Sequence, residues 1–458
     1  MRSVRIKDTS TTAKRCMLTA ALACTLAVVG CGRAPCPEIT RAWKGAPYEY
    51  CIGVYTGTTP VNLVPRAGVP ETPVFTGADI AGVPARFVAD PFVVRRDGAW
   101  YLFFELFNAL TGQGDIGLAT SRDGLQWRFV QTVLDEPFHL SYPFVFEWNH
   151  AWYMLPEGSA SGMLTLYRAV DFPLTWTVDT KLLDGGYVDT TLLHFSGQWW
   201  MFTTPNGSKD LLLFVADNLR GPWKPHPSSP LHKNNGDIAR CGGRMIVYDG
   251  VPLRYTQDDD PAYGNALRAF RITALTATNY VEEPASAQPI LNATGRGWRA
   301  WGMHHLDPVE VQPDHWQAMV DGVGPALPDT PLKVEFANGI CLDGISVRPT
   351  RVNAGSYVLL RYFLSGIPTV FTNKLAVFVH VGPKGSETVF QGDFDLDPKR
   401  EFYEQLIQIP SNAPAGRYEM RVGLCAPETG QSVALKGAGK QRDRYRIGRA
   451  MEVTERNN

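Results

Sequence analysis

The sequence predicts an all-β protein, built from a five-bladed β-propeller followed by an immunoglobulin-like β-sandwich. Two observations support this prediction. A paired-strand motif recurs about every 50 residues between Asp90 and Trp316, and a different strand-rich pattern follows a proline-rich joint at residues 325–331. Repeats of this length that consist of short strands are typical of propeller blades, each of which is one four-stranded sheet.

The first three blades carry the clearest copies of the motif. They read ADPFVVRRDGAWYLFFE (residues 89–105), SYPFVFEWNHAWYMLPE (141–157) and VDTTLLHFSGQWWMFTT (188–204). Each copy has an apolar strand, a polar turn and a second strand that opens on an aromatic pair. An alternating run and a short strand with Trp127, Trp176 or Trp223 follow, as expected for the outer two strands of a blade.

Two weaker copies complete the count of five blades. The fourth covers residues 240–258 and the strands after it, and the fifth runs from MHHLDPVEV (303–311) to HWQAMVDG (315–322). We expect the last blade to take its outer strand from the segment before Asp90, such as ETPVFTG (71–77), because a closed ring protects the sheet edges. The predicted propeller covers residues 61–324.

The N-terminus is similar to a bacterial lipoprotein signal. A basic stretch precedes an apolar core at residues 17–30, which is too short to span a bilayer and has the length of a signal-peptide core. We expect cleavage before Cys31 and lipid attachment to it, with an ordinary secretory signal as the alternative. Residues 1–30 are then the signal and 31–60 a linker. The protein is expected in the bacterial cell envelope, and Gly32 after the cysteine favours the outer membrane.

Composition fits an exported globular protein. Hydrophobic residues make up 44% of the chain, charged residues 19%, and the formal net charge is −1, so we expect neither nucleic acid nor an anionic membrane as a partner. The lipid is the only expected membrane contact, and the sequence carries no signal for an oligomeric state. In an oxidising compartment Cys36–Cys51 and Cys341–Cys425 are candidate disulfides, which leaves Cys241 free.

The C-terminal part, residues 332–455, has strands such as YVLLRYFL, KLAVFVHVG and RYEMRVGLC between Gly, Pro and Asn turns. This pattern predicts a β-sandwich of immunoglobulin type. The amino-acid sequence of this part resembles that of sandwich modules appended to bacterial cell-envelope glycan enzymes. We expect a spacer or a glycan-binding accessory; simple packing against the propeller is the alternative.

Propellers place function in the central channel, which the starts of the innermost strands line. Those starts are Asp90, Tyr142 and Asp189. Hydrolysis of a glycosidic bond requires two carboxyl groups in one site, one to activate water and one to donate a proton. Asp90 and Asp189 are therefore candidate catalytic residues, with capping of blade turns as the alternative, and Tyr142 is a candidate platform for a sugar ring.

Two glutamates end the second strands of blades one and two. Because a second strand runs antiparallel to the first, we expect Glu105 and Glu157 at the face opposite Asp90 unless a bulge or loop redirects them. Each is either an exposed turn residue or a further member of the site.

Blades four and five contribute cationic and imidazole groups. Arg240 precedes a Cys-Gly-Gly segment, and His304, His305 and Asp307 open the fifth blade; these four are candidate substrate-binding residues. Adjacent side chains on a strand face opposite sides, so at most one histidine is expected to point into the channel, where with Arg240 it would bind an anionic or hydroxyl-rich ligand. A metal would need a third ligand from elsewhere, so we expect no metal. The sequence also implies no organic cofactor.

Several ordered motifs resemble a known family over residues 90–322. ADPFVV, WYLFFE, GDIGLATSRDGLQW, LDEPFHLSYPFVFEW, WYMLPEGSASG, VDTTL, WWMFTT and GMHHLDP look like the propeller domain of plant glucosamine inositolphosphorylceramide transferases. In those enzymes the transferase chemistry belongs to a separate nucleotide-sugar domain, and no DxD-type motif in an α/β context occurs here. The resemblance therefore implies the propeller without a nucleotide-sugar glycosyltransferase activity.

The blade plan is more distantly similar to five-bladed, family-43-like glycoside hydrolases that act on arabinan, xylan and fructan. In those, blade one supplies a base Asp, blade three a second Asp and blade four a general-acid Glu. Asp90 and Asp189 match the first two, but the Cys-Gly-Gly segment stands where the Glu would be, so an acid would come from Asp237, Glu157 or Asp307. Two functions follow: a glycoside hydrolase-like enzyme of the envelope, or a non-catalytic glycan-binding lipoprotein.

Overall fold

The computed structural model of the protein describes residues 44–67, 72–371, 373–385, 387–436 and 443–455. The predicted signal peptide, Cys31 and Cys36 lie outside the described residues. Within the described ranges, no helix has the length and apolar character that a membrane span requires.

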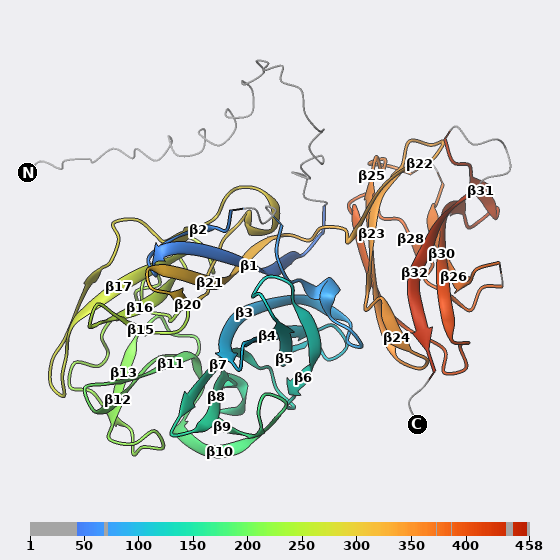
Figure 1. Ribbon diagram of the computed structural model, residues 1–458. Helices are drawn as coiled ribbons and strands as arrows, with labels where there is room; N and C mark the ends of the chain where they lie inside the picture. The colour runs from blue at the N-terminus through green and yellow to red at the C-terminus, as the bar shows by residue number, and fades with distance from the viewer. Residues whose placement is uncertain (1–43, 68–71, 372, 386, 437–442, 456–458) are drawn as a thin grey trace, which may run out of the picture. The chain divides into compact units, whose positions relative to one another are not determined.

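From Tyr48 to Pro325 the described chain forms five antiparallel sheets around a common centre, an arrangement consistent with a β-propeller (Figure 1). The first three sheets each use four consecutive strands. They are β3 (Ala85–Arg96), β4 (Ala99–Asn108), β5 (Gln113–Ser121) and β6 (Arg128–Leu134); β7 (Ser141–Trp148), β8 (Ala151–Glu157), β9 (Met163–Asp171) and β10 (Thr175–Asp184); and β11 (Tyr187–Phe195), β12 (Gln198–Pro205), β13 (Leu212–Ala216) and β14 (Lys224–Pro225).

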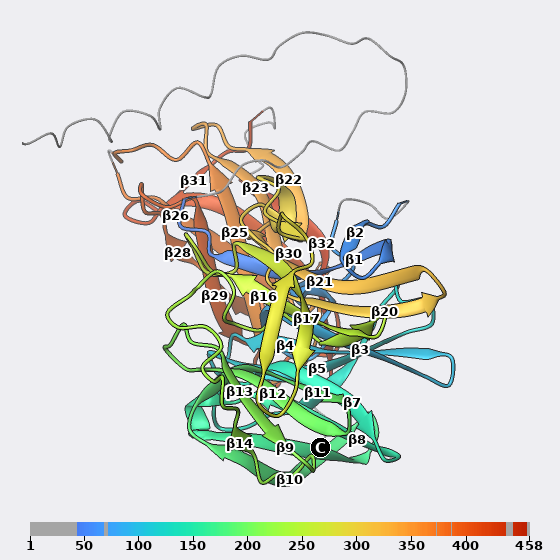
Figure 2. The same ribbon diagram turned by 90° about the vertical axis from the view of Figure 1, so that its left-hand side faces the viewer.

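The fourth sheet begins with a short strand, and its second and third strands β16 and β17 face the viewer in Figure 2. Its strands are β15 (Ile246–Tyr248), β16 (Val251–Asp258), β17 (Ala266–Leu275) and β18 (Tyr280–Pro284), with β19 (Leu291–Asn292) paired to β17. Three short 3-10 helices, η1 (Gly77–Asp79), η2 (Ser159–Ser161) and η3 (Gly297–Arg299), lie in loops of the same part of the chain.

The fifth sheet joins the two ends of the ring. Its hydrogen-bonded order is β20 (Leu306–Gln312), β21 (His315–Pro325), β1 (Tyr48–Thr59) and β2 (Asn62–Pro65). Closure by an N-terminal segment was predicted, but the choice of residues 71–77 was wrong, because Phe75 forms only an isolated bridge with Ile52. Strand β1 pairs with β21 from Tyr48 to Gly57, so the ring begins inside the stretch predicted as a linker.

The aromatic pairs that open the second strands pack between neighbouring sheets. Trp100 joins the cluster between the fifth and first sheets, and Trp199 and Trp200 join the cluster that spans the first to fourth sheets. Phe103 and Phe104 of β4 are fully buried. Full burial of a phenylalanine side chain contributes about 1.5–3 kcal/mol, so these contacts hold the sheets around the centre.

The C-terminal part contains two sheets whose buried side chains form one hydrophobic cluster, which includes Leu342 and Leu360 from one sheet and Val379 and Met420 from the other. The first sheet has β22 (Thr330–Glu335), β23 (Cys341–Arg348), β25 (Tyr357–Ser365) and β29 (Phe402–Gln408). The second has β24 (Arg351–Asn353), β32 (Arg444–Thr454), β30 (Gly416–Ala426), β26 (Ala376–Pro383) and β27 (Phe390–Gln391), with β28 (Phe394–Asp395) and β31 (Gln431–Val433) at its margins.

The described cysteines confirm one part of the thiol prediction and contradict another. Cys341 and Cys425 are both free, so the predicted disulfide between them was wrong: they lie on strands of different sheets. Cys241 is a free, buried thiol, as predicted. The partner predicted for Cys51 lies outside the described residues.

Candidate functional site

The innermost strands of the first three sheets carry a bulge at equivalent points of the repeat. Asp90, Tyr142 and Asp189 have φ values of 51°, 46° and 48°, and the ladder to the second strand shifts register at each of them. A bulge re-aims the side chain that it carries. Asp90 therefore faces the centre from inside β3, which begins at Ala85, rather than from the start of the strand as predicted.

The two glutamates that end the second strands lie beside these bulges. Glu105 pairs with Ala89 and Glu157 with Ser141, because the end of an antiparallel strand meets the start of its partner. The expectation that they lie at the opposite face from Asp90 was therefore wrong. Both are buried, with 7% and 8% of their surface exposed.

The position that Glu105 and Glu157 hold near the end of the second strand carries a polar residue in all five sheets around the centre. Thr204 pairs with Val188, the Gln257 N–H donates to the Arg240 carbonyl, and the Asp321 N–H donates to the His305 carbonyl. Four of the five polar residues stand five places after a tryptophan of the second strand, a spacing that would have revealed Asp321 and Thr204 from the sequence. We call these buried residues the polar ring: Glu105, Glu157, Thr204, Gln257 and Asp321.

Asp321 of β21 connects the first and fifth sheets. Its carboxylate accepts hydrogen bonds from the backbone N–H groups of Asp90 (3.1 Å), His304 (3.3 Å) and His305 (3.0 Å). It also accepts from Nδ1 of the His304 ring at 2.8 Å. One carboxylate thus fixes the positions of three candidate residues.

Both histidines face Asp90. His304 Nε2 lies 3.9 Å and His305 Nδ1 lies 3.8 Å from Asp90 Oδ1. The prediction that at most one points into the centre was wrong, because both residues precede β20 and strand alternation does not apply to them. Aromatic rings hold the imidazoles in place: Tyr50 stacks on His304 at 4.8 Å, and Phe92 meets His305 edge-on at 4.6 Å.

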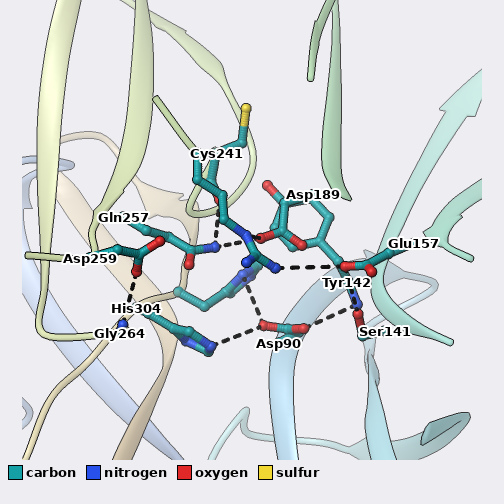
Figure 3. Close-up of polar contacts among 12 residues, drawn as sticks. Asp90, Ser141, Tyr142, Glu157, Asp189, Cys241, Gln257, Asp259, Gly264 and His304 are labelled. Carbon is teal, nitrogen blue, oxygen red and sulfur yellow. Dashed lines mark hydrogen bonds and ion pairs between the residues drawn. The ribbon is translucent and has the colours of Figure 1, made fainter. Parts of the chain in front are cut away.

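Asp189 and Arg240 form the other half of the cluster, and Figure 3 labels Asp189 together with Gln257 and Glu157. Arg240 Nε and Gln257 Nε2 each donate to Asp189 Oδ2 at 2.5 Å. Arg240 Nη2 lies 3.7 Å from Glu157 Oε2, and Ser141 and Ser159 donate to the Glu157 carboxyl group at 3.2 and 3.0 Å. The guanidinium, predicted to bind an anionic or hydroxyl-rich ligand, is thus paired with carboxylates of the protein.

Two candidate residues lie in the packed interior. The Tyr142 ring is fully buried, and its hydroxyl donates to the Gly243 carbonyl (3.0 Å) and accepts from the Gly243 N–H (2.8 Å). Its faces are therefore covered, and no sugar ring can stack on them in this structure. Asp307 is also fully buried, where it accepts from Arg244 Nε at 2.7 Å and the Val93 N–H at 2.6 Å.

Burial dominates the electrostatics of the carboxyl groups. It raises the pKa of Asp90 to about 7, with His304 opposing the rise and Asp189 adding to it. It raises the pKa of Glu157 to about 8, again with a contribution from Asp189. The pKa of Glu105 also rises well above its usual value, through burial and the nearby charge of Asp90. At neutral pH these conditions favour a protonated Glu157.

The two histidines are driven in opposite directions. Burial alone would lower the pKa of His304, but the Asp321 carboxylate outweighs it and the pKa rises to about 9. Burial lowers the pKa of His305 to about 4 despite the same neighbour. Around Asp90 the protein therefore combines one charged and one neutral imidazole at neutral pH.

An exposed aromatic ring stands at the edge of the cluster. Tyr263 is 53% exposed, its ring lies 5.1 Å from the Arg240 guanidinium carbon, and it meets the His304 ring edge-on at 5.4 Å. The loop before β17 that carries it is held by a hydrogen bond from the Gly264 N–H to Asp259 (2.9 Å). An apolar ring face beside hydroxyl-binding groups suits an amphipathic ligand such as a sugar.

Similar proteins were found at the level of sequence and of fold. Glucosamine inositolphosphorylceramide transferase 1 of Oryza sativa subsp. japonica is 36% identical over 296 residues, which cover 60% of this chain and 40% of that protein. The protein of the same name from Arabidopsis thaliana is 37% identical over 300 residues, 60% of this chain and 39% of that one. The chain thus spans about two fifths of the length of the curated relatives that it matches.

Two solved structures were among those that the structural comparison matched, both at low scores. The catalytic domain of Coprinopsis cinerea GH62 α-L-arabinofuranosidase has a TM-score of 0.39 at 14% identity and covers 79% of this chain and 97% of that one. A β-1,2-mannobiose phosphorylase from Listeria innocua has a TM-score of 0.42 at 12% identity, with 58% and 96% covered.

The family match is longer than half of the chain and coincides with the ring of sheets. It covers residues 45–323, from just before β1 to the end of β21. The chain belongs to the family described as glucosamine inositolphosphorylceramide transferase 1, N-terminal.

Proposed function

We propose that this chain is a carbohydrate-active protein whose central site hydrolyses a glycosidic bond. The observation that carries the proposal is the presence, in one buried cluster, of two carboxyl groups with raised pKa values, Asp90 and Glu157. Hydrolysis of this kind needs a carboxyl group that keeps its proton near neutral pH and a second that activates water.

The environment of each carboxyl group suggests its role. Glu157 is the proton donor, since it is buried and carries the higher pKa of the two. Asp90 activates water, since its Oδ1 faces two imidazole nitrogens. Asp189 orients the site through Arg240, which lies between it and Glu157.

We propose a glycan as the ligand, because the rim of the cluster is amphipathic. Tyr263 offers an exposed ring face next to Arg240 and His304. Sugar rings have an apolar face and a polar edge, and such ligands bind where aromatic surface adjoins hydrogen-bonding groups.

The experiment that tests the hydrolase compares the mature protein with its Asp90→Asn and Glu157→Gln variants on a panel of bacterial and plant envelope glycans. We expect release of sugar by the parent protein and a loss of about 10²–10⁴-fold in each variant. Release that is equal in all three proteins would remove Asp90 and Glu157 from the mechanism.

A non-catalytic glycan-binding lipoprotein is the second candidate, favoured by the position of Arg240. The arginine lies in the blade whose counterpart supplies an acid in the hydrolases that the sequence resembles, and it pairs with both Asp189 and Glu157. This candidate predicts that the parent protein and the Asp90→Asn variant retain glycan while neither releases sugar.

Two further parts of the proposal concern the two ends of the chain. We propose that Cys31 is lipidated and anchors the protein in the cell envelope, and that the C-terminal sheets form an immunoglobulin-like sandwich that acts as a spacer or accessory module. Mass spectrometry of the membrane-bound protein and a Cys31→Ala variant tests the first part. Glycan binding by chains that end before and after residues 332–455 tests the second.

A further inference from the structure

Aromatic side chains form a continuous row that starts at the central cluster. The ring of Tyr50 in β1 stacks on that of His304 at 4.8 Å between centroids and lies 5.7 Å from the ring of Phe87 in β3. Phe87 in turn stacks on Phe107 of β4 at 4.8 Å. The Tyr48 ring meets that of Tyr50 edge-on at 6.0 Å. The row therefore leads from a histidine of the cluster to the second strand of the first sheet.

The row lies at the same end of the strands as the polar ring. Phe87 precedes Asp90 in β3, and Phe107 follows Glu105 in β4, where the two phenylalanines are paired across the strands. Both are half-buried, and Tyr48, the first residue of β1, is 58% exposed. Apolar ring surface is thus open to solvent at the end of the first sheet that carries the candidate carboxyl groups.

A hydrogen-bond donor stands at the far end of the row. The His139 ring lies 6.3 Å from that of Phe107, and its Nδ1 accepts a hydrogen bond from the Gly114 N–H at 2.9 Å. Because Nδ1 accepts, the hydrogen of the neutral ring is on Nε2. Nε2 lies 3.6 Å from Glu105 Oε1, which is too far for a hydrogen bond, and 39% of the His139 side chain is exposed. This N–H group is therefore placed to donate to a ligand.

We propose that Tyr48, Phe87, Phe107 and His139 form a second sugar subsite, which binds an uncharged unit of the same glycan chain that occupies the central cluster. We call these four residues the aromatic platform. Ring faces beside a fixed donor suit a sugar, which has an apolar face and hydroxyl groups at its edge. Burial lowers the pKa of His139 below its usual value, so the platform carries no charge at neutral pH and fits a neutral unit better than an acidic one.

The aromatic platform is continuous with the site proposed for the glycan. Tyr50 contacts the platform on one side and His304 on the other, and His304 meets the exposed Tyr263 ring edge-on at 5.4 Å. Exposed aromatic surface is therefore present at both ends of the buried Tyr50–His304 pair. A glycan chain that reaches from one end to the other passes His304, which faces Asp90. The inference rests on the glycan ligand of the proposed function and not on hydrolysis.

The test measures binding by calorimetry to the full mature chain with Asp90→Asn, which removes any effect of turnover. The probes are the monosaccharides and the oligosaccharides, up to hexasaccharides, of the arabinose, xylose, fructose, glucose and mannose series. We expect the longer members of at least one series to bind at least about 10-fold more tightly than its monosaccharide. Affinity that is equal at every length, or no binding in any series, would overturn the proposal. Sugar release by the parent protein together with length-independent binding would refute the platform and leave the hydrolase standing.

Variants then locate the subsite. Phe107→Ala and His139→Ala should each weaken binding of the longer oligosaccharides about 3–10-fold and spare the monosaccharide, because only longer chains reach the platform. Tyr48→Ala, at an exposed position, serves as the second test if Phe107→Ala does not fold. Phe146→Ala is the matched control, since Phe146 is a half-buried phenylalanine stacked on its cross-strand neighbour Tyr153. Unchanged affinity in folded platform variants would mean that these rings only pack the strands.

The octyl glycoside of the sugar that binds best separates a sugar subsite from a site for a lipid chain. An alkyl chain cannot accept a hydrogen bond, so His139→Ala should leave the affinity for the octyl glycoside unchanged while it weakens oligosaccharide binding. If Phe107→Ala weakens binding of the octyl glycoside and not of the oligosaccharides, the platform holds a lipid chain and the proposal is refuted.

Discussion

Two buried groups of charges in the ring of sheets differ in how completely they are paired. In the fourth sheet, fully buried Arg254 donates to both carboxylate oxygens of Glu282, at 3.0 and 2.8 Å. His232 and Tyr280 add contacts to Glu282 at 2.6 Å each. At the centre, Glu157 has two serine hydroxyls and a guanidinium nitrogen 3.7 Å away.

The pKa values separate the two groups. Burial tends to raise the pKa of both glutamates, but Arg254 reverses this for Glu282, whose pKa falls below its usual value, while that of Glu157 rises to about 8. Burial is therefore common to both, and the partners decide whether a carboxyl group serves stability or retains a proton that it can transfer. Four predictions would break or sharpen this comparison.

The largest effect is expected from Glu282→Ala. It leaves the Arg254 guanidinium buried without its partner, and the breaking of a buried ion pair typically costs about 3–5 kcal/mol. Urea unfolding followed by circular dichroism measures the loss. Glu283→Ala, at an exposed neighbouring position, is the control and should change little. A loss below about 1 kcal/mol in the first variant would mean that the pair does not stabilise the fold.

Glu157→Gln should act on turnover and spare the fold. Glutamine has the shape of the protonated acid but cannot donate its proton, so sugar release should fall about 10²–10⁴-fold. The free energy of unfolding should fall by less than about 1 kcal/mol. The charged neighbour of Glu157 is Arg240, and in the variant this arginine keeps its hydrogen bond to Asp189. Glu147→Gln, on the exposed side of β7, is the matched control. Equal losses of stability and activity would indicate a structural role.

The two glutamates should also act on opposite sides of the pH–stability curve. The lowered pKa of Glu282 means that its stabilisation is present above about pH 4.3 and is lost as the pH falls. The raised pKa of Glu157 means that stability falls as the pH rises from about 4.3 toward 8. Glu282→Gln should flatten the acid side and Glu157→Gln the neutral side. The measurement is the unfolding free energy from well below pH 4.3, where Glu282 acts, up to about pH 8, where Glu157 acts, and identical curves for both variants would contradict it.

The smallest effect is expected from Thr204→Val in the polar ring. The Thr204 hydroxyl is buried without a hydrogen-bond partner, so its removal should change the unfolding free energy by less than about 1 kcal/mol. In Thr203→Val, by contrast, the hydroxyl of Thr190 loses its partner at 2.6 Å, which should cost about 1–3 kcal/mol. Thermal unfolding of the two variants side by side gives the comparison, and a reversed order would show that the Thr204 hydroxyl is satisfied in solution.

The repeat in the sequence determined much of the architecture. Strand pairs that recur about every 50 residues, each with an aromatic pair, predict sheets of the observed composition, and Asp90 and Asp189 were found because they open equivalent copies. Such patterns are local: alternation of apolar and polar residues sets which face of a strand is buried, and this is encoded within a few residues. The closing strands were misplaced because pairing of β1 with β21 joins distant segments.

The composition of the site was decided by the tertiary structure. Antiparallel pairing brings Glu157 to the same end as Asp90, and the backbone before β20 turns both His304 and His305 toward it. The full burial of Tyr142 follows from its contact with Gly243, about 100 residues away in the chain. Each of these outcomes depends on which atoms meet across the ring, and a pattern read along one strand holds no information about the strand opposite.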